Sequence, residues 1–132
     1  MKLSVFLPML RPHLLKDMYG SIEKSCSRHS WELVVVGPFS PTQDILDKEN
    51  VIFKEDWGRP TRAAQIAASL CNGELIYHTV DDCLFVENAI SDSIDQYETQ
   101  CQYNDMVGMR YVEGIGYKGN ELSLEDWTIG NN

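Results

Sequence analysis

The sequence predicts an α/β protein built on a central, mostly parallel β-sheet with helices on both faces. Short apolar segments alternate along the chain with segments of helical periodicity, an order that joins parallel strands through right-handed crossovers. Two of the apolar segments, residues 3–8 and 31–37, are nearly continuous. Such segments are typical of strands that are covered on both faces rather than on one.

Three strands and two helices are predicted for the first part of the chain. The first strand ends at Pro8, and Pro12 stands where the following helix begins, a position that proline favours. The second strand, WELVVVG, is rich in β-branched residues and stops at the sequence GPFSP. In chain order we expect a strand at residues 3–8, a helix at 12–26, a strand at 31–37, a brief helix at 42–49 and a strand at 50–55.

The next part of the chain predicts two more helices and two more strands. Pro60 and Thr61 suit the start of an alanine-rich helix, and Asn72-Gly73 suits its end. In chain order we expect a helix within residues 58–73, a strand at 74–80, a helix at 86–101 and a strand at 105–114. The remaining residues, rich in Gly and Asn, show no clear pattern.

Length and composition indicate a single soluble globular domain at residues 1–132. The chain is 43% apolar and 23% charged, without a low-complexity tract or a linker. Its formal net charge of −9 argues against nucleic acid or an anionic membrane as the main partner, because both are anionic. An anionic ligand would therefore need local basic residues or a metal ion.

The cysteines and the N-terminus indicate a cytoplasmic protein. The four cysteines show no C-x-x-C spacing, so neither a zinc knuckle nor a redox motif is indicated, and reduced thiols are the default. The apolar N-terminal run is interrupted by Pro8, Arg11 and Pro12 before a signal peptide or a membrane span is complete. We therefore expect no membrane span.

Asp81 and Asp82 directly follow the predicted strand at residues 74–80. In parallel sheets ligands bind at the carboxyl ends of the strands, and the loops that follow Pro8 and Gly37 should reach the same edge. Carboxylates suit a hard divalent cation, and because neighbouring side chains alternate, one can bind the metal while the other contacts a sugar hydroxyl. Spacing alone leaves a helix cap or a solvated turn equally open.

Three segments, SVFLPMLRP, WELVVVGPFS and TRAAQIAASLCNGELIYHTVDDC, resemble in sequence and order the nucleotide-sugar-binding half of family 2 glycosyltransferases of the GT-A fold. The most specific part runs from TRAAQ through NGELI to VDD, in which Gly73 lies eight positions before Asp81. The similarity covers residues 2–86. It implies a Rossmann-like GT-A domain with a nucleotide-sugar-binding part at residues 1–86 and a reduced acceptor-side part at 87–132.

The resemblance implies a role for each matching residue. Asp82 would bind Mn²⁺ or Mg²⁺, and Asp81 would contact the ribose or the sugar, with a metal ligand as its second role. Arg62, with Arg59 as second choice, would meet the base or the pyrophosphate, and a guanidinium near a helix N-terminus suits a phosphate. Further nucleotide-sugar contacts would come from the ends of the first two strands, at Pro8, Met9, Leu10, Arg11 and Gly37.

The resemblance also implies a carboxylate that deprotonates the acceptor hydroxyl as it attacks the sugar. The late sequence LEDW offers Asp126 as the catalytic base, with Glu125 beside it. A surface position in a C-terminal loop is the alternative for this pair. Glu113 and Glu121 are weaker candidates.

These features predict a glycosyltransferase of the hexosyltransferase class. It would move a sugar from a nucleoside-diphosphate sugar, preferably a UDP-sugar, to a hydroxyl acceptor with inversion. The alternative is a non-catalytic nucleotide-sugar-binding module or subunit without a complete acceptor site, which a second copy of the chain or another subunit would complete. A regulatory phospho-receiver domain is disfavoured, because it would carry acidic residues after the first strand, where this chain has PMLRP.

Overall fold

The computed structural model describes residues 1–109, which divide between two compact units, Met1–Asp92 and the unit that begins at Ser93. The elements in chain order are β1 (Leu3–Pro8), the short 3₁₀-helix η1 (Pro12–Leu14), α1 (Leu15–Ser25), β2 (Trp31–Gly37), α2 (Gln43–Leu46), β3 (Val51–Glu55), α3 (Pro60–Ser69), β4 (Leu75–His78) and α4 (Ala89–Gln100).

The four strands form one sheet in the order β3-β2-β1-β4, and every pairing is parallel. At the centre of the sheet, Phe6 of β1 lies opposite Val34 of β2 on one side and His78 of β4 on the other. The ring of Phe6 also stacks on the imidazole of His78, with their centroids 4.9 Å apart. The predicted α/β class with a parallel sheet is confirmed.

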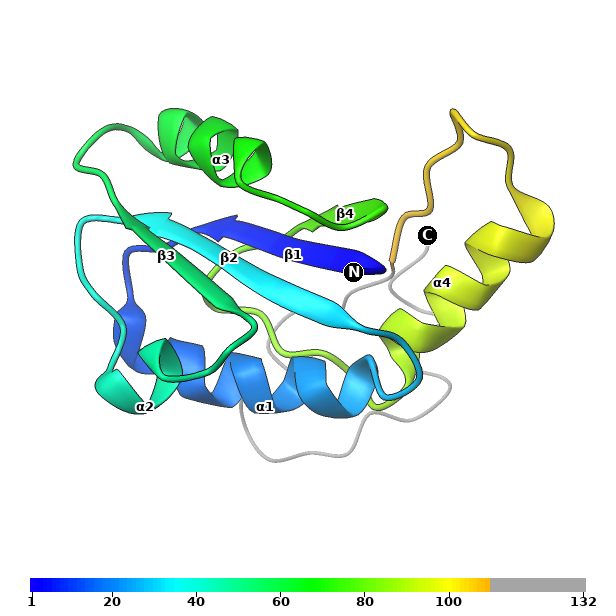
Figure 1. Cartoon of the computed structure of the whole chain (residues 1–132), viewed down its shortest axis with the longest axis horizontal. Helices are drawn as coiled ribbons and strands as arrows, with labels where there is room; N and C mark the ends of the chain where they lie inside the picture. Colours follow the sequence, from blue (N-terminus) through cyan, green and yellow to red (C-terminus); the bar gives the residue numbers. More distant parts are fainter. Residues whose placement is uncertain (110–132) are drawn as a thin grey trace, which may run out of the picture. The chain divides into compact units, whose positions relative to one another are not determined.

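Helices cover both faces of the sheet, with α3 on one face and α1 and α2 on the other (Figure 1). On the α3 face, the apolar cluster consists of Phe6, Val34, Val36, Ala63 and Ala67. The opposite face receives the buried residues of α1, which recur at helical spacing. The two central strands are therefore buried on both sides, which explains why β1 and β2 have the predicted bounds and few polar residues.

Strand β4 is shorter than predicted. It ends at His78, and one further backbone hydrogen bond, from Thr79 N–H to the carbonyl of Phe6 (3.0 Å), keeps the chain beside β1. Burial alternates along β4, and Ile76 is exposed. The predicted strand at 105–114 is not formed over residues 105–109, and its remainder lies outside the described residues.

A polar cluster joins β1, β2 and β4 near their amino ends. The buried Glu32 carboxylate accepts hydrogen bonds from Ser4 Oγ (2.5 Å), Asn72 N–H (2.6 Å) and Asn72 Nδ2 (3.2 Å). Ser4 Oγ accepts one from Gly73 N–H (2.8 Å). A Cβ on Gly73 would lie 2.5 Å from the backbone nitrogen of Ser4, so only glycine fits there. Asn72-Gly73 therefore positions β4 in addition to ending the preceding helix.

Two further predictions concern the membrane and the thiols. Over residues 1–109, no helix has the length and apolar character that crossing a membrane requires. All four cysteines are free thiols. Burial raises the pKa of the Cys26 thiol to about 11, so this cysteine stays protonated and unreactive at neutral pH.

Candidate functional site

The strand order creates a point where the chain changes direction within the sheet. From β1 the chain moves to β2 and then β3 on one side, whereas β4 returns to the other side of β1. The loops after β1 and β4 therefore start side by side at the carboxyl ends of two adjacent strands, where hydrogen bonds from Leu10 and Arg11 to Asp81 join them. In open α/β sheets this is where ligands bind.

Asp81 is buried at this point and holds the loop that follows β1. Its Oδ2 accepts hydrogen bonds from the backbone N–H groups of Leu10 and Arg11, both at 2.9 Å. Its Oδ1 accepts from Arg11 Nε (3.0 Å) and Arg11 Nη2 (2.5 Å). Both carboxylate oxygens of Asp81 are thus engaged with residues 10 and 11, so the predicted ribose contact would require it to share or exchange a partner.

These contacts keep Asp81 charged. Burial raises its pKa, but hydrogen bonds from the Arg11 guanidinium and from the backbone of Leu10 and Arg11 outweigh burial, so its pKa is lowered overall. The hydrogen bond to Asp81 likewise raises the pKa of Arg11. The site therefore contains a fixed anion and a fixed cation at every physiological pH.

Asp82 differs from its neighbour in exposure. Its side chain is 48% exposed, against 8% for Asp81, and its Oδ2 lies 3.3 Å from Arg11 Nη2. The Arg11 guanidinium therefore bridges both carboxylates from one nitrogen. The helix-cap alternative for the pair loses support, because Asp81 binds the β1 loop and α4 begins only at Ala89.

Asp82 fits a Mg²⁺ or Mn²⁺ ion as one carboxylate ligand among several oxygens. Within residues 1–109, no group of three or more His, Cys, Asp or Glu side chains is arranged to hold a metal. An ion at Asp82 would therefore need oxygens from water and from a ligand. That is the usual mode of Mg²⁺, which keeps several waters and binds one or two carboxylates together with ligand phosphates.

The loops after β1, β2 and β3 are joined by backbone contacts. Met9 N–H donates to the carbonyl of Val36 (2.9 Å), and Asp56 N–H donates to the carbonyl of Gly37 (3.0 Å). A Cβ on Gly37 would lie 1.9 Å from the backbone oxygen of Met9, which no side chain could accommodate. Gly37 is thus required for the close approach of two loops at the ligand edge. Pro8 precedes this contact and lies opposite Val36 in the register of β1 and β2.

Arg62 and Arg59 lie at the start of α3, on the β3 side of the sheet. Asp56 holds this turn: its Oδ1 pairs with Arg62 Nη2 (3.1 Å), and its Oδ2 accepts from Gly58 N–H (2.9 Å). Arg59 is the N-cap residue of α3. β3 and β4 are three strand spacings apart, about 14 Å. The two arginines are therefore across the sheet edge from the Asp81–Asp82 pair rather than beside it.

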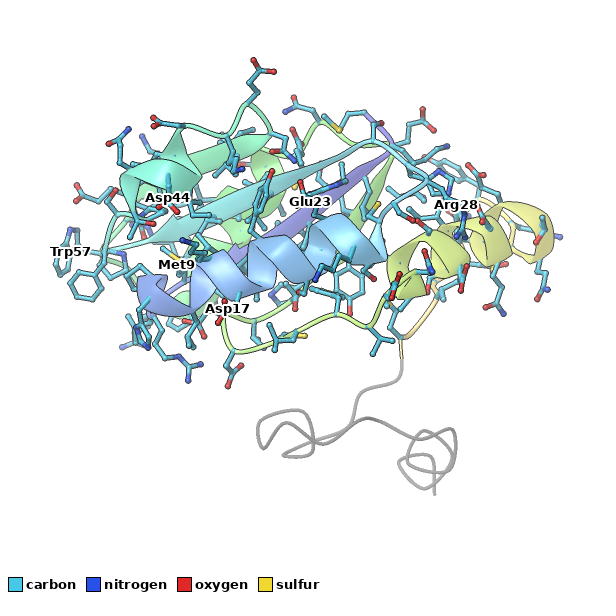
Figure 2. All side chains as sticks on the ribbon, turned by 90° about the horizontal axis from the view of Figure 1, so that it is seen from below. Met9, Asp17, Glu23, Arg28, Asp44 and Trp57 are labelled. Carbon is cyan, nitrogen blue, oxygen red and sulfur yellow. The ribbon has the colours of Figure 1, made fainter. Side chains whose placement is uncertain are left out.

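The sequence offers Trp57, after the third strand, as a residue that faces the ligand edge, but its contact with a second aromatic residue was not predicted. Phe39, after β2, and Trp57, after β3, meet edge to face with their centroids 5.5 Å apart. Trp57 is 71% exposed and Phe39 is 46% exposed. Figure 2 labels Trp57 and Met9 toward the same end of the sheet. Their positions directly after two neighbouring parallel strands were the signal that could have identified them.

The candidate catalytic bases lie outside the described residues. Asp126 and Glu125, and the weaker candidates Glu113 and Glu121, all follow residue 109. Their roles stay predictions.

The fold is consistent with a Rossmann-like glycosyltransferase fold. A crystal structure of residues 1–349 of S. aureus TarS, a glycosyltransferase, is similar to this chain with a TM-score of 0.57 at 18% sequence identity. The similarity covers 86% of this chain and 40% of that of TarS. Comparisons with models of known protein families and with curated proteins gave no match. The likeness therefore shows a glycosyltransferase-like fold, and the chain spans well under half of the TarS structure.

Proposed function

We propose that the protein is a metal-dependent glycosyltransferase that transfers a sugar from a nucleoside-diphosphate sugar to a hydroxyl acceptor. The observation that carries the proposal is the carboxylate pair between β1 and β4, in which buried Asp81 orders the loop and half-exposed Asp82 faces outward. A glycosyltransferase-like fold with this pair at the strand ends supports a donor site there. UDP is the favoured nucleoside diphosphate, and family 2 the proposed family.

The residues divide the work of donor binding. Asp82 would hold Mn²⁺ or Mg²⁺, which when bound neutralises charge on the departing nucleoside diphosphate. Arg11 lies within reach of the same diphosphate because its guanidinium already touches Asp82. Across the edge, Phe39 and Trp57 offer aromatic faces on which a base can stack, and Arg59 and Arg62 follow Trp57 at the start of α3. An inverting transfer would then be a single displacement, with Asp126 as the proposed base.

The second candidate is a nucleotide-sugar-binding module or subunit that performs no transfer by itself. The observation that favours it is that residues 10 and 11 engage both oxygens of Asp81, which leaves Asp82 as the one half-exposed carboxylate of the pair. A partner subunit or a second copy would then supply the acceptor side.

Asp82→Asn tests the proposal, with Glu74→Gln as the matched control. Glu74 is also an exposed carboxylate in an ion pair, with Lys2 (2.8 Å), but it lies at the opposite end of β4. We expect Asp82→Asn to lose Mn²⁺-dependent binding of UDP while its circular dichroism spectrum stays unchanged, because an amide is a poor ligand for a hard cation. Glu74→Gln should bind as the wild type does.

Calorimetry with UDP, GDP and dTDP, with and without Mn²⁺, measures this binding. Donor hydrolysis and transfer assays then separate the two candidates. Turnover by the wild type supports the enzyme, and metal-dependent binding without turnover supports the module. Equal affinity of Asp82→Asn and the wild type would show that the metal assignment is wrong.

A further inference from the structure

Arg11 lies where a cation bound by both carboxylates would be placed. Its Nη2 is 2.5 Å from Asp81 Oδ1 and 3.3 Å from Asp82 Oδ2. We propose that Arg11 is a positioning residue that occupies Asp82 in the free protein and releases it to a divalent cation only when a diphosphate takes up the guanidinium. Metal binding would then depend on the nucleotide. This inference rests on the proposed function.

The two contacts of Arg11 are unequal in a way that allows this exchange. On Asp81, Arg11 makes two side-chain hydrogen bonds and one backbone hydrogen bond to a buried carboxylate. On Asp82 it makes a single longer contact to a side chain that is about half exposed. The contact with Asp81 therefore holds Arg11 in place, and the contact with Asp82 is the one that breaks when a ligand binds. The backbone of Arg11 stays in place while its guanidinium changes partner.

Charge explains why the cation alone would bind weakly. The two carboxylates and the guanidinium together carry one negative charge, so Arg11 has already neutralised half of the pair. A divalent ion at Asp82 would meet the guanidinium at close range and be repelled by it. A diphosphate adds negative charge between the two cations and offers Arg11 a bidentate partner in place of Asp82.

The exchange makes the two ligands cooperative. If a diphosphate raises the affinity for the metal, the metal must raise the affinity for the diphosphate by the same factor. The diphosphate group suffices for this effect, since Arg11 contacts no element of the β2 or β3 loops in the hydrogen bonds found for it. Inorganic pyrophosphate should therefore act as UDP does on the metal affinity.

The decisive measurement is the binding of Mn²⁺ alone, followed by the electron paramagnetic resonance signal of the free ion. We expect wild-type protein to bind Mn²⁺ weakly, and UDP or pyrophosphate to raise that affinity at least tenfold after correction for Mn²⁺ held by free ligand. Arg11→Gln should bind Mn²⁺ alone about tenfold more tightly than the wild type and gain little from added diphosphate.

Two further variants sharpen the test. Arg11→Met keeps the aliphatic stem without the charge and should behave as Arg11→Gln does, which guards against misfolding of one variant. Arg28→Gln is the matched control, because Arg28 is similarly exposed and pairs with Asp92 (2.6 Å) away from the site. It should bind Mn²⁺ as the wild type does.

The outcomes distinguish this inference from the proposed function. If the wild type binds Mn²⁺ equally well with and without diphosphate, or if neither neutral variant binds it more tightly, the role of Arg11 is overturned even where UDP binding needs Mn²⁺. If UDP and pyrophosphate bind no form of the protein, with or without Mn²⁺, the proposed donor site itself fails.

Discussion

The sheet carries a buried carboxylate near each of its ends, and the two are held differently. Glu32, near the amino ends, accepts hydrogen bonds only from neutral groups, on Ser4 and Asn72. Asp81, at the carboxyl ends, binds two backbone N–H groups and the charged side chain of Arg11. In both, burial raises the pKa and hydrogen bonds lower it by more.

The difference separates a structural polar cluster from a functional one. The donors of Glu32 are Ser4 of β1 and Asn72 just before β4, and neither carries a charge that an anionic ligand could take up. The donor of Asp81 is a guanidinium that is 47% exposed and that also touches Asp82. A buried anion whose partner reaches solvent can take part in ligand binding, whereas an enclosed one with neutral partners mainly fixes the register of the strands.

The largest effect on stability is expected for Glu32→Ala. The change leaves the fully buried Ser4 Oγ and the part-buried backbone N–H of Asn72 without their acceptor, which costs about 3 kcal/mol in the free energy of unfolding. Glu32→Gln keeps the shape and one acceptor oxygen, so we expect a loss of about 1 kcal/mol. Urea denaturation measures both. UDP binding by the folded fraction should be unchanged, and a loss of binding would contradict the assignment of Glu32 to structure alone.

A smaller loss of stability is expected for Asp81→Ala, about 2 kcal/mol, because its donors belong to the exposed residues Leu10 and Arg11, whereas Glu32 has a fully buried donor, Ser4. Here the loop should respond as well. Hydrogen exchange of the Leu10 and Arg11 amides should become faster, and UDP binding should be lost together with loop order. Unchanged exchange at these two amides would show that Asp81 does not hold the loop.

The smallest effect on stability is expected from the protonation of Asp81 and Glu32 in acid. The folded-state pKa values of Asp81 and Glu32 lie below their ordinary values of 3.8 and 4.5, so the unfolded state binds more protons as the pH falls. Their contribution to stability is therefore complete above about pH 5 and is lost as the pH drops through the lowered values. The double variant Glu32→Gln with Asp81→Asn should show a flatter decline in stability over that range than the wild type. Parallel declines would contradict the direction of both shifts.

The sequence predicts the two central strands of this fold better than the edge strand β4, for a physical reason. Strands β1 and β2 are buried on both faces, so composition alone marks their bounds. Strand β4 lies at the edge of the described sheet with alternating burial, and its end is set by a hydrogen bond to Phe6, which no local pattern reveals. The end of β4 thus depends on a residue that is distant in sequence, and the sequence locates such an end poorly.

In the candidate site, too, local sequence patterns predict some features, while contacts between residues distant in sequence determine others. That Asp81 and Asp82 follow a strand was predictable, and so was their meeting with the loop after β1, because parallel strands end at one edge. The division between an anchoring and an exposed carboxylate was not, since it depends on hydrogen bonds between residues 70 positions apart, Arg11 and Asp81. The contact between Phe39 and Trp57 was not predicted, because the two residues are distant in sequence and no local pattern links them.

The contact between Gly37 and the backbone of Met9 constrains how this protein can diverge. Because the missing side chain is what lets the two loops touch, a larger residue at position 37 requires a different path for the chain after β1. That path also carries Arg11, whose backbone N–H binds Asp81. A substitution of Gly37, which contacts neither carboxylate, would thus move the Arg11 guanidinium that lies between Asp81 and Asp82. The loops after β1 and β2 can therefore vary only together.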